Sequence, residues 1–222
     1  MANSTFTTIG RKVLMALSGF FLMFFLLQHL TINMLSVISP DMFNSVSHFF
    51  GYNPVIQFAL QPVLIFAVVF HFIMGFYLEL KNNKAREVKY AANSASENSS
   101  WISRNMVYSG LVILAFLALH FADFWIPEME YKYVAAEAQD ATRYHHELVE
   151  KFQSPVKVGL YALSFVFLAL HLLHGFQSAF QTVGFNNKYT PLLKKLGNIY
   201  GVAIPALFIL IAVYHYLNPL TH

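Results

Sequence analysis

Four histidines lie within long apolar stretches of the chain and fall into two sets with repeated sequence context. In the first set the histidine lies ten residues after the glycine of a Ser-Gly dipeptide, and in the second it lies four residues before a Gly-Phe dipeptide. The first set is His29 after Ser18-Gly19 and His120 after Ser109-Gly110; the second is His71 before Gly75-Phe76 and His171 before Gly175-Phe176. This repetition indicates a duplicated two-helix unit with a fifth helix added.

Imidazoles are rare in stretches that could cross a membrane, and a function is the default interpretation for them. Two neutral imidazoles facing each other across a helical bundle can hold a flat iron porphyrin from both sides. With both axial positions filled, such a haem has no site for oxygen and is suited to electron transfer. A single histidine on an apolar helix more often makes a hydrogen bond to a neighbouring helix than binds a metal. Four at matched positions favour haem ligation.

Depth in the membrane sorts the four histidines into two pairs. Counted from the flanking basic residues and prolines, His29 and His120 lie at one depth and His71 and His171 at another. We call the first two the outer pair and the second two the inner pair. They differ by about ten residues, or about 15 Å of helix. Gly19 and Gly110 fall near the inner pair, where a missing side chain would admit a macrocycle edge, although close helix packing also explains them.

The composition excludes a soluble protein. Hydrophobic residues make up 57% of the 222 residues and charged residues 11%, whereas about a quarter of an ordinary globular domain is charged. The 17% aromatic content would leave adhesive surface in water. A soluble cytosolic enzyme and a disordered chain are therefore excluded. Without cysteine, this chain has no disulfide, thiolate metal site or iron–sulfur cluster of its own.

The expected fold class is an all-α membrane protein, a single transmembrane domain over residues 1–222 whose first four helices form the haem-binding bundle. A helix needs about 20 mostly apolar residues to cross a bilayer. Kinks are expected at Pro62 and Pro205, and the first span is too long for a cleaved signal peptide. The five expected spans are approximately Val13–Ile38, Val55–Leu80, Met106–Ile126, Val156–Val183 and Asn198–Leu217.

The charged residues are sorted between the two ends of these spans. Ten of the fourteen Lys and Arg residues fall on the side of the N-terminus, and eight of the eleven acids fall on the other side. The positive-inside rule therefore places the N-terminus in the cytoplasm and the C-terminal His222 outside. The net charge of +3 is the sum of two opposite faces and gives no reason to expect a nucleic-acid partner.

The connections and the remaining histidines give four smaller expectations. Lys81–Ser103 is predicted to be a polar cytoplasmic loop, and a short surface helix is expected within Glu128–Gln153, around Tyr133–Gln139. His215 has no counterpart and is expected to be interfacial. His174 lies one turn from His171, and only the alignment of the two His-x-x-x-Gly motifs favours His171 as the ligand.

These residues belong to longer segments that resemble the cytochrome b membrane-anchor subunits of bacterial succinate dehydrogenase and fumarate reductase. The resemblance is to the type with five spans and two haems in one polypeptide, and it covers essentially the whole chain. Its segments are Gly10–Gly19 with His29-Leu30 and Asn33, His71 with Ala85–Tyr90, Ser100–Met106, Tyr108–Gly110 with His120, and His171–Gly175 with Phe180–Gly184.

The resemblance implies two haem b groups, with His29 and His120 ligating the outer (distal) haem and His71 and His171 the inner (proximal) one. It also implies a flavoprotein subunit with FAD and an iron–sulfur subunit, both bound at the cytoplasmic face of the bacterial inner membrane. The chain would not act on succinate itself but would transfer electrons and exchange them with a quinone, usually menaquinone. Some relatives carry a Glu for a transmembrane proton path where this chain has Ala169, which argues against such a path here.

Quinone chemistry also needs a proton donor or acceptor beside an apolar slot near a haem. Asp123, one turn beyond His120, and Asp41 and His48 in the outer loop are candidates, although solvated loop residues are the favoured interpretation of all three. Three basic residues could neutralise the inner-haem propionates, and the positive-inside pattern explains them equally well: Arg11, Arg104 and Lys188.

Two other functions stay open at this point. The chain could be a dihaem cytochrome b that anchors a different dehydrogenase, such as one for formate or hydrogen. It could also be a membrane transporter or helix-packing protein without haem. Membrane lipid is the expected surrounding in every case.

Overall fold

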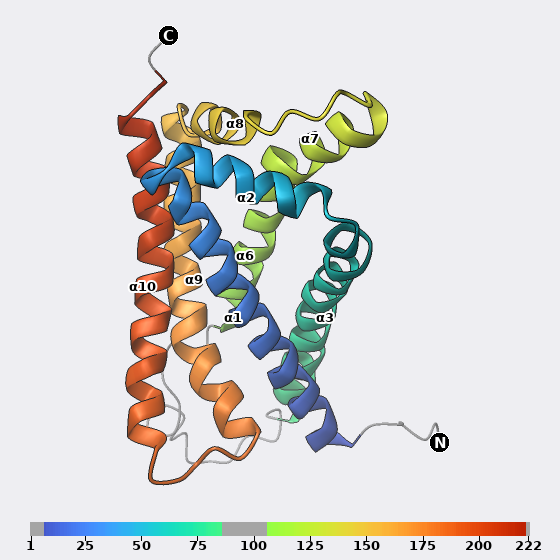
Figure 1. Cartoon of the computed structure of the whole chain (residues 1–222). Coiled ribbons are helices and arrows are strands. Elements are labelled where there is room, and N and C mark those ends of the chain that lie inside the picture. The colour runs from blue at the N-terminus through green and yellow to red at the C-terminus, as the bar shows by residue number, and fades with distance from the viewer. Residues whose placement is uncertain (1–6, 86–105, 221–222) are drawn as a thin grey trace.

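A computed structural model describes residues 7–85 and 106–220, and every regular element in these two ranges is helical (Figure 1). Five helical segments there are long and apolar enough to cross a membrane. The predicted all-α membrane class with five spans is therefore confirmed. Arg104, His222 and residues 86–103 of the predicted loop lie outside the described residues. Residues 81–85 of that predicted loop are helical instead, because the helix of the second span continues to Ala85.

The five spans are built from single helices or from α-helices joined by π-helical turns. The first, fourth and fifth are α1 (Thr8–Ile38), α9 (Pro155–Thr182) and α10 (Thr190–Leu217). The second is the π-helical turn η1 (Ile56–Leu60) followed by α3 (Gln61–Ala85). The third comprises α6 (Met106–His120), η2 (Phe121–Trp125), α7 (Ile126–Met129) and η3 (Glu130–Val134).

Two shorter helices, α2 (Pro40–Tyr52) and α8 (Arg143–Lys151), lie across one end of the bundle, which we call the capped end (Figure 1). The opposite end, where α1 begins, is the N-terminal end. Ser39 makes the turn from α1 into α2, because its backbone N–H bonds to the Leu35 carbonyl at 2.8 Å and its hydroxyl accepts from the Met42 N–H at 3.4 Å. Pro40 at the first helical position suits this N-cap.

Helix α9 lies at the centre of the bundle and packs against α10, α6 and α1. Two glycines bring α10 close to it. A Cβ on Gly197 would lie 2.6 Å from the Phe176 ring, and one on Gly201 would lie 3.0 Å from the Leu173 backbone nitrogen. Small residues at such a crossing allow the close helix packing that stabilises bundles in lipid.

The apolar core is concentrated near the capped end, whereas α3 is widely exposed. Phe66 and Ile73 on α3 are 68% and 60% exposed, as expected for side chains that face lipid rather than protein. The core joins α1, α2, α8, α9 and α10 through Leu30, Phe43, Leu148, Phe152, Tyr161, Phe165, Ile204, Phe208, Ile211 and Ala212.

Several predicted boundaries were wrong. The fifth span begins at Thr190 rather than Asn198, because Pro191 starts a helix within the polar connection. The third continues to Val134 rather than stopping at Ile126. The short surface helix expected within Glu128–Gln153 is confirmed as α8. Within Tyr133–Gln139, however, only Tyr133 and Val134 are helical, and Ala136 takes a positive φ of 50° just beyond them.

The two prolines predicted to cause kinks have different surroundings. Pro62 follows directly on the π-helical turn η1, and such a turn is a recognised way to accommodate a residue without a backbone N–H. Pro127 lies just after η2 in the same way. Pro205, by contrast, lies inside α10 and is fully buried.

Candidate metal centres

The inner pair comes together between α3 and α9. The ring centres of His71 and His171 lie 6.3 Å apart, with their planes at 67°. Two imidazoles bound to one metal from opposite sides, with metal–nitrogen bonds of about 2 Å as in histidine–zinc sites, place their ring centres about 6 Å apart. The two rings are therefore at a separation that fits axial ligation.

Each inner-pair ring lies against the Ser-Gly dipeptide of its own repeat. His71 Nδ1 is 2.9 Å from the Ser18 hydroxyl, and His171 Nδ1 is 3.3 Å from the Ser109 hydroxyl. A Cβ on Gly19 would lie 3.6 Å from His71 Cε1, which is ordinary van der Waals contact. The structure thus places the Ser-Gly dipeptides at the depth of the inner pair, where the spacing predicted them.

The outer pair comes together between α1 and α6. The ring centres of His29 and His120 lie 5.8 Å apart, with their planes at 86°. A phenylalanine one turn earlier stacks on each ring: Phe25 on His29 at 5.5 Å and Phe116 on His120 at 5.7 Å. The repeat therefore extends to the aromatic neighbours of the outer pair.

Polar partners of the outer pair are few. His120 Nδ1 is buried without a hydrogen-bond partner, and the ring nitrogens of His29 lie 3.4 and 3.5 Å from the amide of Asn33. A buried polar atom without a partner costs free energy, so its presence between aromatic rings is typical of a functional group rather than of a packing residue.

Both pairs fit a haem by their donor chemistry. Each supplies two imidazoles from different helices, and a porphyrin would supply the four in-plane nitrogens. No cluster of three or more side chains suited to a bare metal ion occurs in the part of the chain that the structure describes.

His174 and His215 are placed differently from the four paired histidines. Within the described ranges His174 makes no hydrogen bond or ring contact, whereas His171 contacts both His71 and Ser109. His215, near the end of α10, is 1% exposed, and its Nε2 lies 2.8 Å from the Ser36 hydroxyl.

The burial of His215 depends on a contact that sequence reasoning missed. His145 on α8 packs its ring against that of His215, with centres 5.4 Å apart, and its Nε2 lies 3.2 Å from the Ser36 carbonyl. Helix α8 thereby covers the end of α10. No local pattern links residues so far apart in the chain, and only the number of histidines near the capped end hinted at this cluster.

Asp123, a candidate for proton exchange, is buried and paired. It is 6% exposed, with Lys157 Nζ at 2.5 Å and the Tyr161 hydroxyl at 3.0 Å from its two carboxylate oxygens. The interpretation of Asp123 as a solvated loop residue was therefore wrong. Because the Tyr161 ring centre also lies 6.3 Å from that of His120, this charged pair adjoins the outer pair.

The other two candidates, Asp41 and His48, lie on α2 rather than in a loop. Asp41 is exposed in the first turn. His48 has a buried Nδ1 without a hydrogen-bond partner, and its ring lies 4.7 Å from that of Tyr52. No hydrogen bond or ion pair joins these two residues to each other or to Asp123 within the described ranges.

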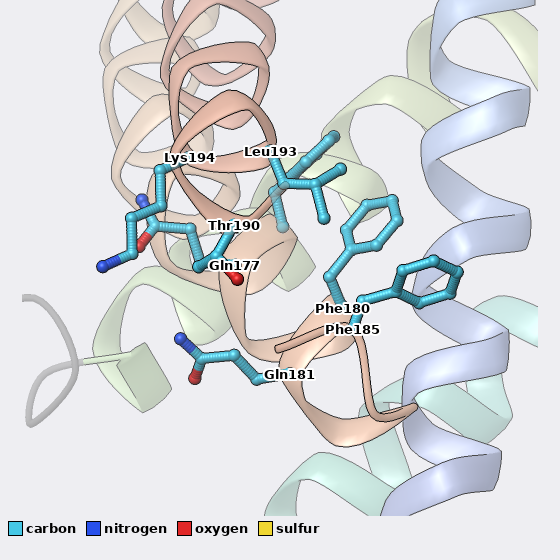
Figure 2. Close-up of a pocket in the computed structure, with 8 residues that line it drawn as sticks. Gln177, Phe180, Gln181, Phe185, Thr190, Leu193 and Lys194 are labelled. Carbon is cyan, nitrogen blue, oxygen red and sulfur yellow. The ribbon is translucent and has the colours of Figure 1, made fainter. Parts of the chain in front are cut away.

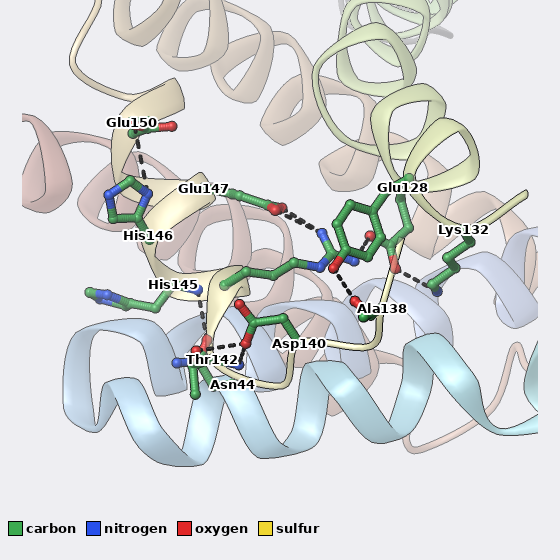
Figure 3. A network of polar contacts seen from close by, with 12 residues as sticks. Asn44, Glu128, Lys132, Ala138, Asp140, Thr142, His145, His146, Glu147 and Glu150 are labelled. Atoms are coloured by element: carbon green, nitrogen blue, oxygen red, sulfur yellow. Dashed lines mark hydrogen bonds and ion pairs between the residues drawn. The ribbon is translucent and has the colours of Figure 1, made fainter. Parts of the chain in front are cut away.

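A network of charged side chains fastens α8 to the end of the third span (Figure 3). Arg143 binds Glu128 and also Glu147, the latter at 2.8 Å, and Lys132 binds Glu128 at 2.5 Å. Although burial opposes its charge, hydrogen bonds to Glu147 and Glu128 raise the pKa of Arg143. Burial, followed by the charge of Glu128, raises the pKa of Tyr144 above its ordinary 10.0.

The N-terminal end carries basic side chains and a shallow pocket between α9 and α10. Figure 2 shows Gln177, Gln181 and Lys194 around this pocket, with Phe180 and Phe185 on one side of it. Of the residues considered for haem propionates, Arg11 donates a hydrogen bond to the Tyr77 hydroxyl on α3. Lys188 lies in the α9–α10 connection, 5.2 Å from the Tyr189 ring centre.

Comparison with curated proteins shows a similarity to a cytochrome b subunit. The succinate dehydrogenase cytochrome b558 subunit of Bacillus subtilis (strain 168) is 24% identical to this chain over 163 residues. The match covers 72% of each of the two chains. No family model matches, and no solved structure matches.

Proposed function

We propose that this chain is the dihaem cytochrome b membrane anchor of a succinate:menaquinone oxidoreductase, and that it transfers electrons between the iron–sulfur subunit and menaquinone. One observation carries the proposal: histidines from four different spans form two facing pairs, with ring centres 6.3 and 5.8 Å apart. The similarity to the cytochrome b558 subunit of Bacillus subtilis succinate dehydrogenase supports this enzyme class.

His71 and His171 would hold the inner haem b, and His29 and His120 the outer one. Bound haem supplies reversible one-electron chemistry. Each pair would supply two imidazoles to the haem that it holds, so that no ligand position would stay open to oxygen. Side chains such as Phe25 and Phe116 cover the outer imidazoles and keep water from them.

The two pairs lie at different depths of the bundle. Gly19, on which a Cβ would lie in contact with the inner His71, precedes the outer His29 by ten residues on the same helix. At the rise of an α-helix this separation is about 15 Å. Two redox centres spaced along the bundle would carry electrons between the N-terminal end and the capped end.

The partner subunits would dock at the N-terminal end. Exposed basic side chains gather there, with Lys12 at the start of α1 and Lys194 and Lys195 in the first turns of α10. The flavoprotein and iron–sulfur subunits would carry the FAD and the iron–sulfur clusters. This arrangement corresponds to a bacterial cytoplasmic membrane protein with a cytoplasmic N-terminus and a C-terminus outside.

Proton exchange with menaquinone would take place at the capped end, where all three candidate residues lie. Asp123 already binds Lys157 and Tyr161, and Asp41 is exposed. His48 combines a buried ring nitrogen with the lack of a hydrogen-bond partner. It is therefore the candidate best placed to give or accept a proton.

Isolation of the native complex tests this proposal. A tagged chain, solubilised in mild detergent, should bring with it a subunit with covalent flavin and an iron–sulfur subunit, and added succinate should reduce a b-type absorption band. Recovery of a formate dehydrogenase or a hydrogenase instead would show a dihaem anchor for another enzyme. A preparation without any b-type band would refute both haem functions and leave a transporter or helix-packing protein.

A further inference from the structure

The two serines of the repeated Ser-Gly dipeptides each touch a backbone carbonyl and an inner-pair imidazole. Ser18 Oγ lies 2.8 Å from the Met15 carbonyl oxygen and 2.9 Å from His71 Nδ1. Ser109 Oγ lies 2.7 Å from the Met106 carbonyl oxygen and 3.3 Å from His171 Nδ1. Both serines are buried.

The number of protons and lone pairs available in these contacts decides which tautomer each imidazole has. A serine hydroxyl has one proton and two lone pairs, and a carbonyl oxygen can only accept. The hydroxyl of Ser18 must therefore donate to the Met15 carbonyl, and its contact with His71 is a hydrogen bond only if Nδ1–H donates to it. The same count holds for Ser109. The hydrogen-bond network thus assigns the proton of each inner imidazole to Nδ1.

A neutral imidazole protonated at Nδ1 presents an unprotonated Nε2. That nitrogen carries the lone pair an axial ligand needs, and the bond made by the other nitrogen sets which of the two is free. We propose that Ser18 and Ser109 are positioning residues, each of which holds one inner-pair histidine in the Nδ1–H tautomer with Nε2 available to the haem iron. The role toward iron rests on the proposed function, whereas the tautomer does not.

Of the two facing pairs, the inner one has this arrangement and the outer one does not, within the described ranges. Among the described residues, the outer His120 has a buried Nδ1 without a hydrogen-bond partner, and the ring nitrogens of His29 have the Asn33 amide at 3.4–3.5 Å. Loss of the serines should therefore affect one haem and spare the other.

Ser164 on α9 donates to the Leu160 carbonyl and contacts no histidine within the described ranges, so a buried helix hydroxyl can lack an imidazole partner. Ser36 does make such a contact, with His215 Nε2 at 2.8 Å, but His215 belongs to neither facing pair.

The direction of the effect follows from the chemistry of the ligand. A hydrogen bond from Nδ1–H makes an axial imidazole a better electron donor, which stabilises the oxidised iron. Replacing Ser18 by alanine removes the acceptor and leaves the Nδ1–H of His71 without a partner. The inner haem should then be easier to reduce and less firmly held.

The test compares Ser18→Ala, Ser109→Ala and the double variant in the purified complex, with Ser18→Thr as the variant that keeps the hydroxyl. Ser164→Ala is the control for loss of a buried helix hydroxyl. A redox titration of the b-type band should show the inner transition at a more positive potential in each alanine variant and the outer transition unchanged. Ser18→Thr should restore the inner transition, and the double variant should lose part of the inner haem.

Unchanged inner transitions in both single variants and in the double variant would overturn the proposal, as would an equal shift in Ser164→Ala. If the wild-type preparation has no b-type band, the proposed function fails. The tautomer of His71 can still be determined in that same preparation by ¹⁵N NMR. The ¹⁵N shifts of His71, assigned with His71→Gln, should then show a protonated Nδ1. An unprotonated Nδ1 would overturn the positioning role itself.

Discussion

The imidazoles of His71 and His171 face each other from α3 and α9 with ring centres 6.3 Å apart, although each ring bonds to a serine of its own repeat. The pairing therefore joins the two halves of the duplication, whereas the supporting contacts stay within each half. The same is true of the outer pair, which joins α1 to α6. Neither half of the repeat alone supplies both imidazoles of a pair, so each pair needs both halves.

Replacement of single ligands should separate the two centres. Glutamine at His29 or His120 should abolish or shift the outer redox transition and spare the inner one, and glutamine at His71 or His171 should do the reverse. The reason is that each variant leaves one facing pair intact. Redox titration of the b-type band measures this. Loss of the same haem in the His29 and His71 variants would contradict the pairing.

His174 provides the matched control for His171. It lies one turn away on α9 but makes no ring contact or hydrogen bond within the described ranges, whereas His171 contacts His71. His174→Gln should therefore keep both haems, as measured by the haem content per chain. If that variant alone lost the inner haem, the choice between the two histidines would have to be reversed.

The sequence predicted which histidines lie together better than it predicted their surroundings. The pairs followed from spacing because histidines at equal depth on neighbouring helices must lie close together. The cap helix α2 was not predicted, although Ser39-Pro40 is a recognisable helix start. The burial of His215 had no local signal, because it depends on α8 folding back over α10. Tertiary contacts of this kind are not encoded in the pattern of a single span.

The buried pair of Asp123 and Lys157 should contribute to stability at the capped end. Asp123→Asn removes the charge that faces Lys157 and weakens the bond from Tyr161. Breaking a fully buried pair costs about 3–5 kcal/mol, and because Lys157 is a third exposed we expect about 1–3 kcal/mol here. The thermal transition of the detergent-solubilised protein should fall accordingly.

The control for Asp123→Asn is a substitution in an exposed ion pair, that of His146 with Glu150. The side chains of His146 and Glu150 are 55% and 63% exposed, and such pairs contribute little to stability. Glu150→Gln should therefore leave the thermal transition unchanged. A wild-type transition in Asp123→Asn, or an equal fall in both variants, would show that the buried pair has no special role.

Tyr144 should resist ionisation at high pH. Burial and then the charge of Glu128 raise its pKa above the ordinary 10.0, so the folded protein keeps this proton after the unfolded chain has lost it. The stability this group contributes is complete below pH 10.0 and decreases as the pH rises toward the raised pKa. Phenolate absorbance can be measured as the pH is raised to about 11. The curve of Tyr144→Phe should coincide with that of the wild type, because Tyr144 does not ionise in this range. Loss of one tyrosine's absorbance in that range would contradict the raised pKa.

The haem content of the purified chain tests the central claim most directly. A haem assay combined with quantitative amino-acid analysis should give two b-type haems per polypeptide, because the chain has two facing imidazole pairs. The His29→Gln and His71→Gln variants should each give one. A wild-type preparation without b-type haem would contradict the account, and a single haem would contradict its assignment of two centres.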